Sequence, residues 1–268
     1  MKILLTNDDG VYAQGLGAIK KSLQGLGEVV VVAPDAEQSG VGHSITFSHP
    51  LRIRPVYVDD EFFGYGVSGS PADCVKLGVM EIMKCQPRLL VSGINMGSNT
   101  GIHVLYSGTV AAAIEGAILG IPSVALSLDV SNFPDLEYAA IISRDIIEIL
   151  LGHDLPRGTL LNVNFPSVRR EEIKGVRFTK QYTYSFEESV DCRKDPGGKT
   201  YYWLVGGREI TVEEEGTDTE ALSHGYISIT PLTCDLTNHE LLDKIGHWEW
   251  GQLEQRFKKT TTFLGKEV

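Results

Sequence analysis

The sequence predicts an α/β fold in which a mostly parallel sheet is covered by helices on both faces. Two observations carry this prediction. Short apolar runs that end at polar turn residues are typical of buried parallel strands, and the segments between them place apolar residues at helical spacing. Strand and helix therefore alternate as in a doubly wound sheet. The predicted strands lie at 3–5, 28–32, 88–92, 122–128 and 159–164.

The first strand-helix-strand unit determines the topology. After the strand at 3–5, Leu16, Ile19 and Leu23 recur at helical spacing, and Gly25 ends the predicted helix. The next strand follows at 28–32. Strand, helix and strand within about thirty residues form the right-handed βαβ unit of a Rossmann-like sheet. The carboxyl ends of its parallel strands meet at one edge of the sheet.

The middle of the chain continues this alternation. Residues 45–63 have the character of extended segments. A helix follows, and its start is marked by Ser70 at the N-cap, Pro71 at the first position and Asp73 at the third. Two further helices, at 110–119 and 136–151, alternate with the later strands. These elements complete the doubly wound pattern.

The character of the chain changes from residue 171, where short aromatic-rich strands flank a turn at 195–198 with the sequence Asp-Pro-Gly-Gly. This pattern is a hairpin signal. We expect a single domain over 1–268, with a core at about 1–170 and 216–240, a protruding β-hairpin excursion at about 171–215 and a helical tail at about 241–268. An isolated hairpin with exposed aromatics is marginally stable, so we expect it to pack on a second copy of the chain.

Composition excludes several functions. The net charge of −11 argues against a nucleic-acid binder, because phosphate-backbone contacts need clustered Lys and Arg. The four cysteines include no Cys-x-x-Cys pair, which favours a reducing compartment. Only three apolar residues lie between Lys2 and the first acidic residues, and no later run approaches the length of a membrane span. We therefore expect a cytoplasmic protein with no membrane partner.

Two adjacent carboxylates, Asp8 and Asp9, follow the first strand. In open α/β sheets, ligands bind outside the carboxyl ends of the strands. Adjacent carboxylates raise each other's pKa unless a positive group lies beside them, and a hard divalent cation is the simplest such group. The same stretch, residues 7–10, is also a favoured turn sequence, so the residues alone leave both interpretations open.

Other loops at the same predicted edge offer further oxygen atoms. Ser39 lies in the loop after the second strand, and Asn95 follows the strand at 88–92. An all-oxygen donor set favours Mg²⁺, Mn²⁺ or Ca²⁺ over Zn²⁺, although loop hydrogen bonding is the commoner role of such residues. Ser107 and Thr109 stand at the start of a small-residue helix, where free N–H groups form an anion site. His43 is a candidate acid, base or phosphate contact on its loop.

Several segments carry a resemblance to a known family, namely Asn7-Asp-Asp-Gly10, Ala33-Pro-Asp35 with Ser39-Gly-Val-Gly42, Ser70-Pro-Ala-Asp-Cys-Val75, Ser92-Gly-Ile-Asn95 with Gly97 and Asn99, Tyr106-Ser-Gly-Thr-Val110, and Gly216-Thr-Asp218 with Ser228-Ile-Thr-Pro231. Together they resemble the SurE (survival protein E) family of metal-dependent nucleotidases. The resemblance covers most of residues 1–165 and the segment near 216–232, in order along the chain. Its departures are mild: Ser70 stands where Thr is common, and Thr100 where an aliphatic residue is common.

The resemblance implies hydrolysis of nucleoside 5′- and 3′-monophosphates to nucleoside and phosphate, with short polyphosphate as a further candidate substrate. It implies one divalent ion per subunit, Mg²⁺ or Mn²⁺, with Ca²⁺ as another candidate occupant. It also implies a homodimer or homotetramer formed through the hairpin and the C-terminal region. The implied metal ligands are Asp8, Asp9, Ser39 and Asn95; the implied catalytic residues are Asp8, Asp9 and Asn95; the implied phosphate or substrate contacts are Asn7, Gly40, His43, Asn99, Ser107, Gly108 and Thr109.

Two rival functions remain to be weighed. A haloacid-dehalogenase-like phosphatase uses an Asp nucleophile in an Asp-x-Asp sequence after its first strand, whereas residues 7–9 are Asn-Asp-Asp. A receiver-like signalling module binds Mg²⁺ at an acidic pair without turnover, but it needs an acceptor Asp where this chain has Asn95. This chain therefore lacks a residue that each of the two rival functions requires.

Overall fold

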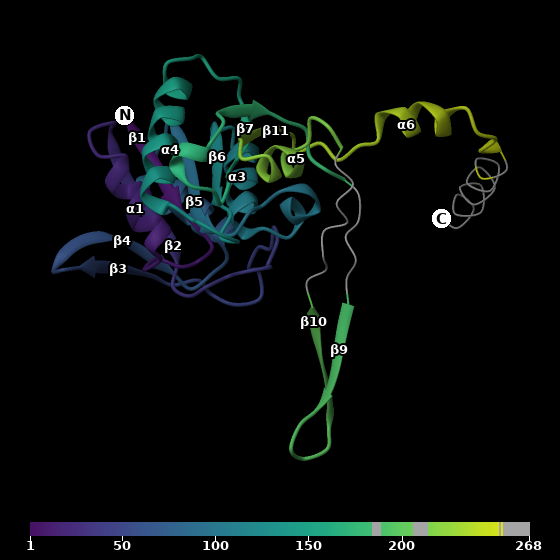
Figure 1. Ribbon diagram of the computed structural model, residues 1–268, viewed down its shortest axis with the longest axis horizontal. Coiled ribbons are helices and arrows are strands. Elements are labelled where there is room, and N and C mark those ends of the chain that lie inside the picture. Colours follow the sequence, from purple (N-terminus) through teal and green to yellow (C-terminus); the bar gives the residue numbers. More distant parts are fainter. Residues whose placement is uncertain (184–188, 206–213, 252, 254–268) are drawn as a thin grey trace, which may run out of the picture. The chain divides into compact units, whose positions relative to one another are not determined.

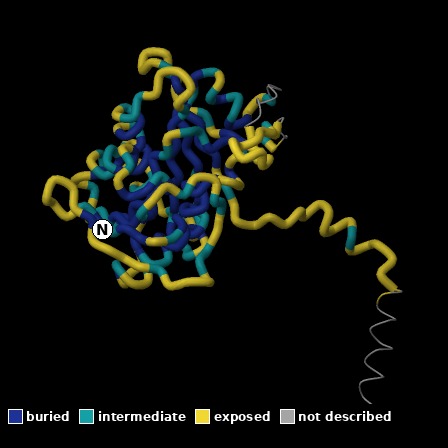
Figure 2. The backbone as a smooth tube through the Cα atoms, turned by 90° about the horizontal axis from the view of Figure 1, so that it is seen from below, coloured by how far each residue is buried: buried dark blue, intermediate teal, exposed yellow. Residues whose placement is uncertain are grey.

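The computed structural model describes residues 1–183, 189–205, 214–251 and 253 (Figure 1). Their contacts divide the chain into two compact units, Met1–Cys234 and Asp235–Val268. In the first unit the buried residues gather in the interior, and many exposed residues lie on connecting loops (Figure 2). Each helix among the described residues is too short or too polar to span a lipid bilayer.

A nine-stranded sheet forms the centre of the first unit. Its strands are β1 (Lys2–Thr6), β2 (Glu28–Pro34), β3 (Ile53–Val58), β4 (Glu61–Val67), β5 (Leu89–Met96), β6 (Ser123–Leu128), β7 (Leu160–Phe165), β8 (Val176–Phe178) and β11 (Ile227–Leu232). Their order across the sheet is β3-β4-β2-β1-β5-β6-β7-β11-β8. All neighbours from β4 to β7 are parallel, while β3 and β11 run antiparallel to β4 and β7. The predicted mostly parallel sheet is confirmed.

Helices cover both faces of this sheet (Figure 1). Residues of α1 (Gln14–Ser22) and α4 (Leu136–Leu151) share one hydrophobic core with Ile3 and Leu5 of β1. Residues of α2 (Pro71–Leu77) and α3 (Gly108–Ile118) share the other core with Leu4. Alternate residues of β1 therefore face opposite layers, as the pleat of a strand requires. The short helical segments are η1 (Gly78–Met83), η2 (Gly101–Leu105), η3 (Arg170–Glu172) and α5 (Asp218–Ser223).

The direction of the strand order reverses beside β1. The chain passes from β1 through α1 to β2 on one side, and later from β4 through α2 to β5 on the other side. β1 and β5 pair in parallel with Thr6 opposite Ser92. A crevice outside the carboxyl ends at such a switch point is the usual ligand site of an open α/β sheet. Asn7 to Gly10 follow β1 at this point.

The helices of one layer begin at residues that the sequence marks. The Ser70 hydroxyl accepts the Asp73 N–H at 3.1 Å, and the Asp73 carboxylate accepts the Ser70 N–H at 2.9 Å. This reciprocal capping confirms the predicted start of α2. The Ser107 hydroxyl caps α3 by accepting the Val110 N–H at 3.1 Å. The N-terminus of α3 therefore begins directly after Ser107.

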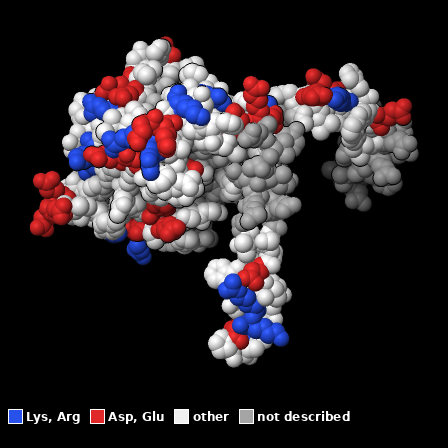
Figure 3. Space-filling view, in the orientation of Figure 1, with Lys and Arg blue, Asp and Glu red and all other residues white. Residues whose placement is uncertain are grey.

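A separate two-stranded antiparallel sheet, β9 (Ser189–Lys194) and β10 (Thr200–Val205), confirms the predicted hairpin. Its turn is closed by the Asp195 carboxylate, which accepts the Lys199 N–H at 2.9 Å. Trp203 and Leu204 on β10 are 60% and 85% exposed. Residues 184–188 and 206–213 of the predicted hairpin region lie outside the described residues. Lys and Arg side chains also gather on this hairpin (Figure 3), namely Arg193, Lys194 and Lys199.

The second unit contains α6 (His239–Gly246), which is capped by Asn238 accepting the Leu241 N–H at 2.8 Å. The rings of Trp248 and Trp250 stack with their centroids 6.1 Å apart. The predicted helical tail falls within this unit, and its residues 252 and 254–268 lie outside the described residues.

α1 lies unusually close to the backbone of β5 at Gly15. A Cβ atom on Gly15 would come 1.9 Å from the Ile94 carbonyl oxygen, whereas a Cβ on Gly17 of the same helix would meet nothing within 4 Å. Only a glycine at position 15 therefore permits this contact between helix and sheet.

We expect Gly15→Ala to lower the free energy of unfolding by about 3 kcal/mol, because α1 must move away from β5. Gly17→Ala is the matched control, and it should raise the stability by up to about 1 kcal/mol through helix propensity. Urea denaturation of both variants measures the difference. Equal stabilities of the two variants would contradict this packing.

Candidate active site

Asp8 and Asp9 lie just beyond β1 at the switch point. Asp8 is 4% exposed and Asp9 is half-buried. Burial raises the pKa of the Asp8 carboxyl above its ordinary value, and hydrogen bonds from Thr109 oppose this rise. Burial and the charge of Asp8 raise the pKa of Asp9 to about 6. Among the described residues, no Lys, Arg or His forms an ion pair with either carboxylate. The pair therefore carries negative charge that a cation would neutralise.

Hydrogen bonds connect the Asp pair to three other segments. The Thr109 hydroxyl at the start of α3 donates to Asp8 Oδ1. The N–H of Gln38 donates to the Asp8 carbonyl oxygen at 2.8 Å, and the N–H of Met96 donates weakly to Asp9 Oδ2 at 3.4 Å. The structure thus brings the predicted loops after β1, β2 and β5 together with α3.

Ser39 and Asn95 lie directly beside these connections. The Ser39 side chain is exposed, and its hydroxyl donates to Glu37 Oε1 at 2.6 Å. The Asn95 amide nitrogen donates to the Gly97 carbonyl oxygen at 2.7 Å. The Asn95 amide oxygen has no hydrogen-bond partner among the described residues, so it is available as an acceptor.

Of the other predicted substrate contacts, Asn7 and Asn99 are buried and Gly40 is exposed. Asn7 is fully buried, and its amide donates to the Gly10 carbonyl oxygen at 2.9 Å, so it shapes the turn that carries the Asp pair. The Asn99 amide donates to the Ser127 hydroxyl at 2.8 Å inside the protein. Gly40 is exposed on the Ser39 loop with a φ of 70°. The geometry therefore ties the Asn7 and Asn99 side chains into internal contacts.

The N-terminus of α3 closely approaches Asp8. A Cβ on Gly108 would come 2.7 Å from Asp8 Cβ and 3.0 Å from Asp8 Oδ2. Gly108 is the first residue of α3, so its N–H has no acceptor within the helix, and the Ser107 hydroxyl serves as the cap. A free N–H at a helix N-terminus beside the Asp pair favours an anion there.

The His43 side chain contacts Glu115 and not the Asp pair. Its Nε2 lies 2.9 Å from Glu115 Oε2, and Lys76 Nζ lies 2.6 Å from Glu115 Oε1. Burial raises the pKa of the Glu115 carboxyl, but the contacts with His43 and Lys76 outweigh this and hold the pKa below its ordinary value. Glu115 was not among the residues predicted for the site from the sequence. The available signal was a lone charge in a helix built of small apolar residues.

Asp218 is a second residue that was not predicted for the site from the sequence. It is fully buried, and its carboxylate accepts the N–H groups of Gly101 at 2.9 Å, Tyr182 at 3.0 Å and Thr219 at 2.9 Å. Burial raises the pKa of the Asp218 carboxyl, and these N–H groups act against the rise. Asp218 thereby joins the loop after β5 to the segments that flank α5. Such partners, distant in sequence, leave no local pattern.

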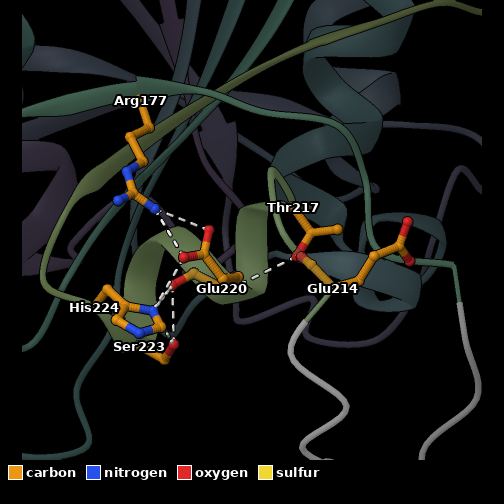
Figure 4. A network of polar contacts seen from close by, with 6 residues as sticks. All are labelled: Arg177, Glu214, Thr217, Glu220, Ser223 and His224. Atoms are coloured by element: carbon orange, nitrogen blue, oxygen red, sulfur yellow. Dashed lines mark hydrogen bonds and ion pairs between the residues drawn. The ribbon is translucent and has the colours of Figure 1, made fainter.

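A network of charged residues holds α5, which begins at Asp218 (Figure 4). Arg177 on β8 donates to both carboxylate oxygens of Glu220, at 2.8 and 2.9 Å. His224 Nδ1 lies 3.2 Å from the same carboxylate. The Thr217 hydroxyl caps the helix by accepting the Glu220 N–H at 3.3 Å. The position of Asp218 is therefore supported from both ends of α5.

The donor set at the switch point fits a hard cation. The described residues contain no group of three or more His, Cys, Asp or Glu side chains suited to a metal. A cation here would therefore rest on two carboxylates supplemented by hydroxyl and amide oxygens. The unpaired charge of Asp8 and Asp9 and the free amide oxygen of Asn95 match the oxygen ligands that Mg²⁺, Mn²⁺ and Ca²⁺ prefer.

A family model and curated proteins of similar sequence point to the same family. The model of the family described as Survival protein SurE matches residues 3–188. A 5′-nucleotidase SurE of Syntrophobacter fumaroxidans is 45% identical over 250 residues, which cover 92% of this chain and 99% of that protein. A 5′-nucleotidase SurE of Rhodopirellula baltica is 46% identical over 249 residues, covering 92% of this chain and 98% of that protein.

A solved structure shares the fold. The crystal structure of the SurE protein from Aquifex aeolicus superposes with a TM-score of 0.80 at 45% identity, covering 91% of this chain and 98% of that chain. The likeness therefore extends over the α/β body and beyond the segments on which the sequence resemblance was based.

We expect Asp218→Asn to lower the free energy of unfolding by about 1–3 kcal/mol, because an amide cannot accept hydrogen bonds at both of its heavy atoms and one buried N–H is left unsatisfied. Asp145→Asn, on the exposed face of α4, is the control and should change stability by less than about 0.5 kcal/mol. Urea denaturation of both variants gives the comparison. Wild-type stability of Asp218→Asn would contradict the assigned contacts.

Proposed function

The chain belongs to the survival protein SurE family, and we propose that it is a 5′-nucleotidase, a phosphomonoesterase that releases phosphate from nucleoside 5′-monophosphates. The observation that carries the proposal is the unpaired Asp8–Asp9 pair at the switch point, beside the free N–H of Gly108. The names of its relatives support the same reaction. Nucleoside 3′-monophosphates and short polyphosphate are further proposed substrates.

Activity in this proposal depends on one divalent cation, Mg²⁺ or Mn²⁺, with Ca²⁺ as an alternative occupant. Asp8 and Asp9 would hold it through carboxylate oxygens, Asn95 through its free amide oxygen and Ser39 through its hydroxyl. The Ser39 hydroxyl would exchange its contact with Glu37 for the cation. When bound, such an ion neutralises phosphate charge and lowers the pKa of a water molecule.

The chain's own residues orient the reaction. The Thr109 hydroxyl holds Asp8 by donating to Oδ1, which leaves Oδ2 on the side of Gly108. The Gly108 N–H and the α3 dipole bind a phosphate oxygen, and backbone N–H groups of the Ser39–Gly40 loop bind another. Attack by water in line with the leaving nucleoside oxygen then requires no covalent intermediate.

Asn95 completes the proposed catalytic set with Asp8 and Asp9. Ser107 supports the phosphate site as the cap of α3, and Asn7 supports it by forming the turn that presents the Asp pair. Asn99 contributes from inside the protein, through its contact with Ser127. His43 pairs with Glu115 and lies on the loop that carries Ser39.

A phosphate-release assay over the nucleoside monophosphates tests the proposal directly. We expect adenosine 5′-monophosphate or another mononucleotide to be hydrolysed, chelation to abolish the reaction, and Mn²⁺ or Mg²⁺ to restore it. Asp8→Asn and Asp9→Asn should each lower the rate at least about 100-fold, since each removes an electrostatic contribution. Full turnover by verified metal-free protein, or wild-type rates in these variants, would contradict the proposal.

Gly108→Ala should lower kcat/KM by about 100-fold, because the added Cβ collides with Asp8 and displaces the phosphate site. Gly116→Ala is a control on the same helix. Its added Cβ would lie 2.4 Å from Ser123 Oγ of β6, on the side of α3 that packs against the sheet. It should lower stability and leave kcat/KM of the folded protein unchanged. Equal loss of activity in both variants would assign the effect to helix packing.

We also propose that the chain assembles as a homodimer or homotetramer through the hairpin and the C-terminal region. Exposed Trp203 and Leu204 offer an apolar surface, and the basic side chains on the same hairpin suit a copy of a chain whose net charge is −11.

Light scattering of the intact chain should report at least two copies, and Trp203→Ser with Leu204→Ser should shift it toward one. Ile149→Ser, which changes an exposed apolar residue on α4, should leave the assembly unchanged. A monomeric intact chain would contradict the proposed assembly.

A further inference from the structure

Glu115 is the only charged residue of α3 and is 1% exposed. Both of its carboxylate oxygens are engaged, Oε1 with Lys76 and Oε2 with His43. Removing a carboxylate from water is costly, and the cost is offset only when its partners are well placed. A helix that needed only to pack against the sheet would carry an apolar residue here. Packing of α3 against the sheet therefore does not account for a carboxylate at position 115.

His43 lies on the loop that carries Ser39, and this loop is fastened on both sides of Ser39. Before it, the Gln38 N–H donates to the Asp8 carbonyl oxygen at 2.8 Å. After it, the Gly42 N–H donates to the Tyr106 carbonyl oxygen at 3.0 Å, and His43 reaches Glu115. The Ser70 hydroxyl also donates to the Ser44 carbonyl oxygen at 2.7 Å, at the end of the loop. Among the described residues, the Ser39 hydroxyl forms its hydrogen bond with Glu37 alone. The position of Ser39 therefore depends on these flanking contacts.

The loop backbone offers little rigidity of its own. Gly40 and Gly42 have φ angles of 70° and 56°, and glycine is the residue that adopts this region at least cost. The folded loop must hold two such residues in one conformation, which costs conformational entropy. A side chain anchored on a rigid, buried helix compensates for this cost. Among the described residues, His43 provides such an anchor between the loop and α3.

We propose that Glu115 is a positioning residue, which acts through His43 to hold the loop at 38–44 where Ser39 can complete the oxygen ligands of the proposed cation site. Lys76 balances the charge of Glu115 and has no contact with the loop among the described residues. The inference rests on the metal site proposed above. It assigns His43 to the support of a metal ligand in place of direct phosphate contact. Supporting residues of this kind commonly change metal affinity about 10- to 100-fold when removed.

The two partners of Glu115 supply a matched pair of variants. His43→Ala removes the side-chain anchor of the loop on α3 and leaves Glu115 paired with Lys76. Lys76→Met removes the other partner and leaves the loop attached through His43. Both variants remove one partner of the same buried carboxylate, but only the first one loosens the loop that carries Ser39. A difference between them therefore reports on loop position rather than on the stability of α3.

The measurement is Mn²⁺ binding to the full chain without nucleotide, followed by electron paramagnetic resonance of free Mn²⁺. His43→Ala should raise the Kd about 10-fold, while Lys76→Met should change it less than about twofold and should lower the urea midpoint. His43→Gln, whose amide can donate to Glu115, should restore most of the affinity. Ser39→Ala combined with His43→Ala should bind no more weakly than Ser39→Ala alone, because both act through one ligand.

The proposal is overturned if His43→Ala binds Mn²⁺ as the wild type does, or if Lys76→Met weakens binding equally. Should His43→Ala not fold, His43→Asn, with a side chain one methylene shorter than that of His43→Gln, takes its place in the same comparison. Asp8→Asn separates the two proposals. If the wild type binds no Mn²⁺, or Asp8→Asn binds it normally, the metal site itself is wrong; if only the His43 effect is missing, the positioning role alone is wrong.

Discussion

Unneutralised negative charge at the end of β1 is the constraint on which the rest of the site depends. Asp8 is buried, the adjacent Asp9 is half-buried, neither has a basic partner among the described residues, and burial raises both pKa values. Such an arrangement is unfavourable in the protein alone. It becomes favourable when a cation is bound. The fold keeps the pair in place through the Thr109 hydroxyl, the Gln38 and Met96 N–H groups, and the turn closed by Asn7.

One helix, α3, connects the separate parts of the site. Its first turn contacts Asp8 through Thr109 and presents the N–H of Gly108. Further along, Glu115 reaches the Ser39 loop through His43. Gly116 packs so closely on β5 that an added Cβ would lie 2.8 Å from Leu90. Because α3 packs closely on the sheet, it holds the carboxylate pair, the proposed phosphate site and the Ser39 loop in fixed positions relative to one another.

Local patterns predicted the elements of this fold but not its distant contacts. The apolar runs identified β1, β2 and β5 to β7, and the Ser70 cap and the helix at 136–151 were predicted at the residues where they occur. These features depend on neighbours in sequence. The antiparallel pairing of β11 with β7 and the burial of Asp218 and Glu115 depend on partners far along the chain. A single sequence contains no periodic signal for such contacts.

The same division applies to the site. Position after a strand placed Asp8, Asp9, Ser39 and Asn95 at one edge, since parallel strands end together. The contacts of His43 with Glu115, of Thr109 with Asp8 and of Asn99 with Ser127 show that hydroxyl, imidazole and amide groups also serve the protein's interior. Residue type alone cannot separate a group that contacts substrate from one that supports such a group.

The central claim is that the charge at the end of β1 is completed by one divalent cation. Crystals soaked in Mn²⁺ and measured at the manganese absorption edge test it most directly. We expect one anomalous peak per chain at the switch point, about 2.0–2.3 Å from oxygen atoms of Asp8, Asp9 and Asn95. No peak there, or a peak held by other residues while Asp8 and Asp9 stay without a ligand, would contradict it.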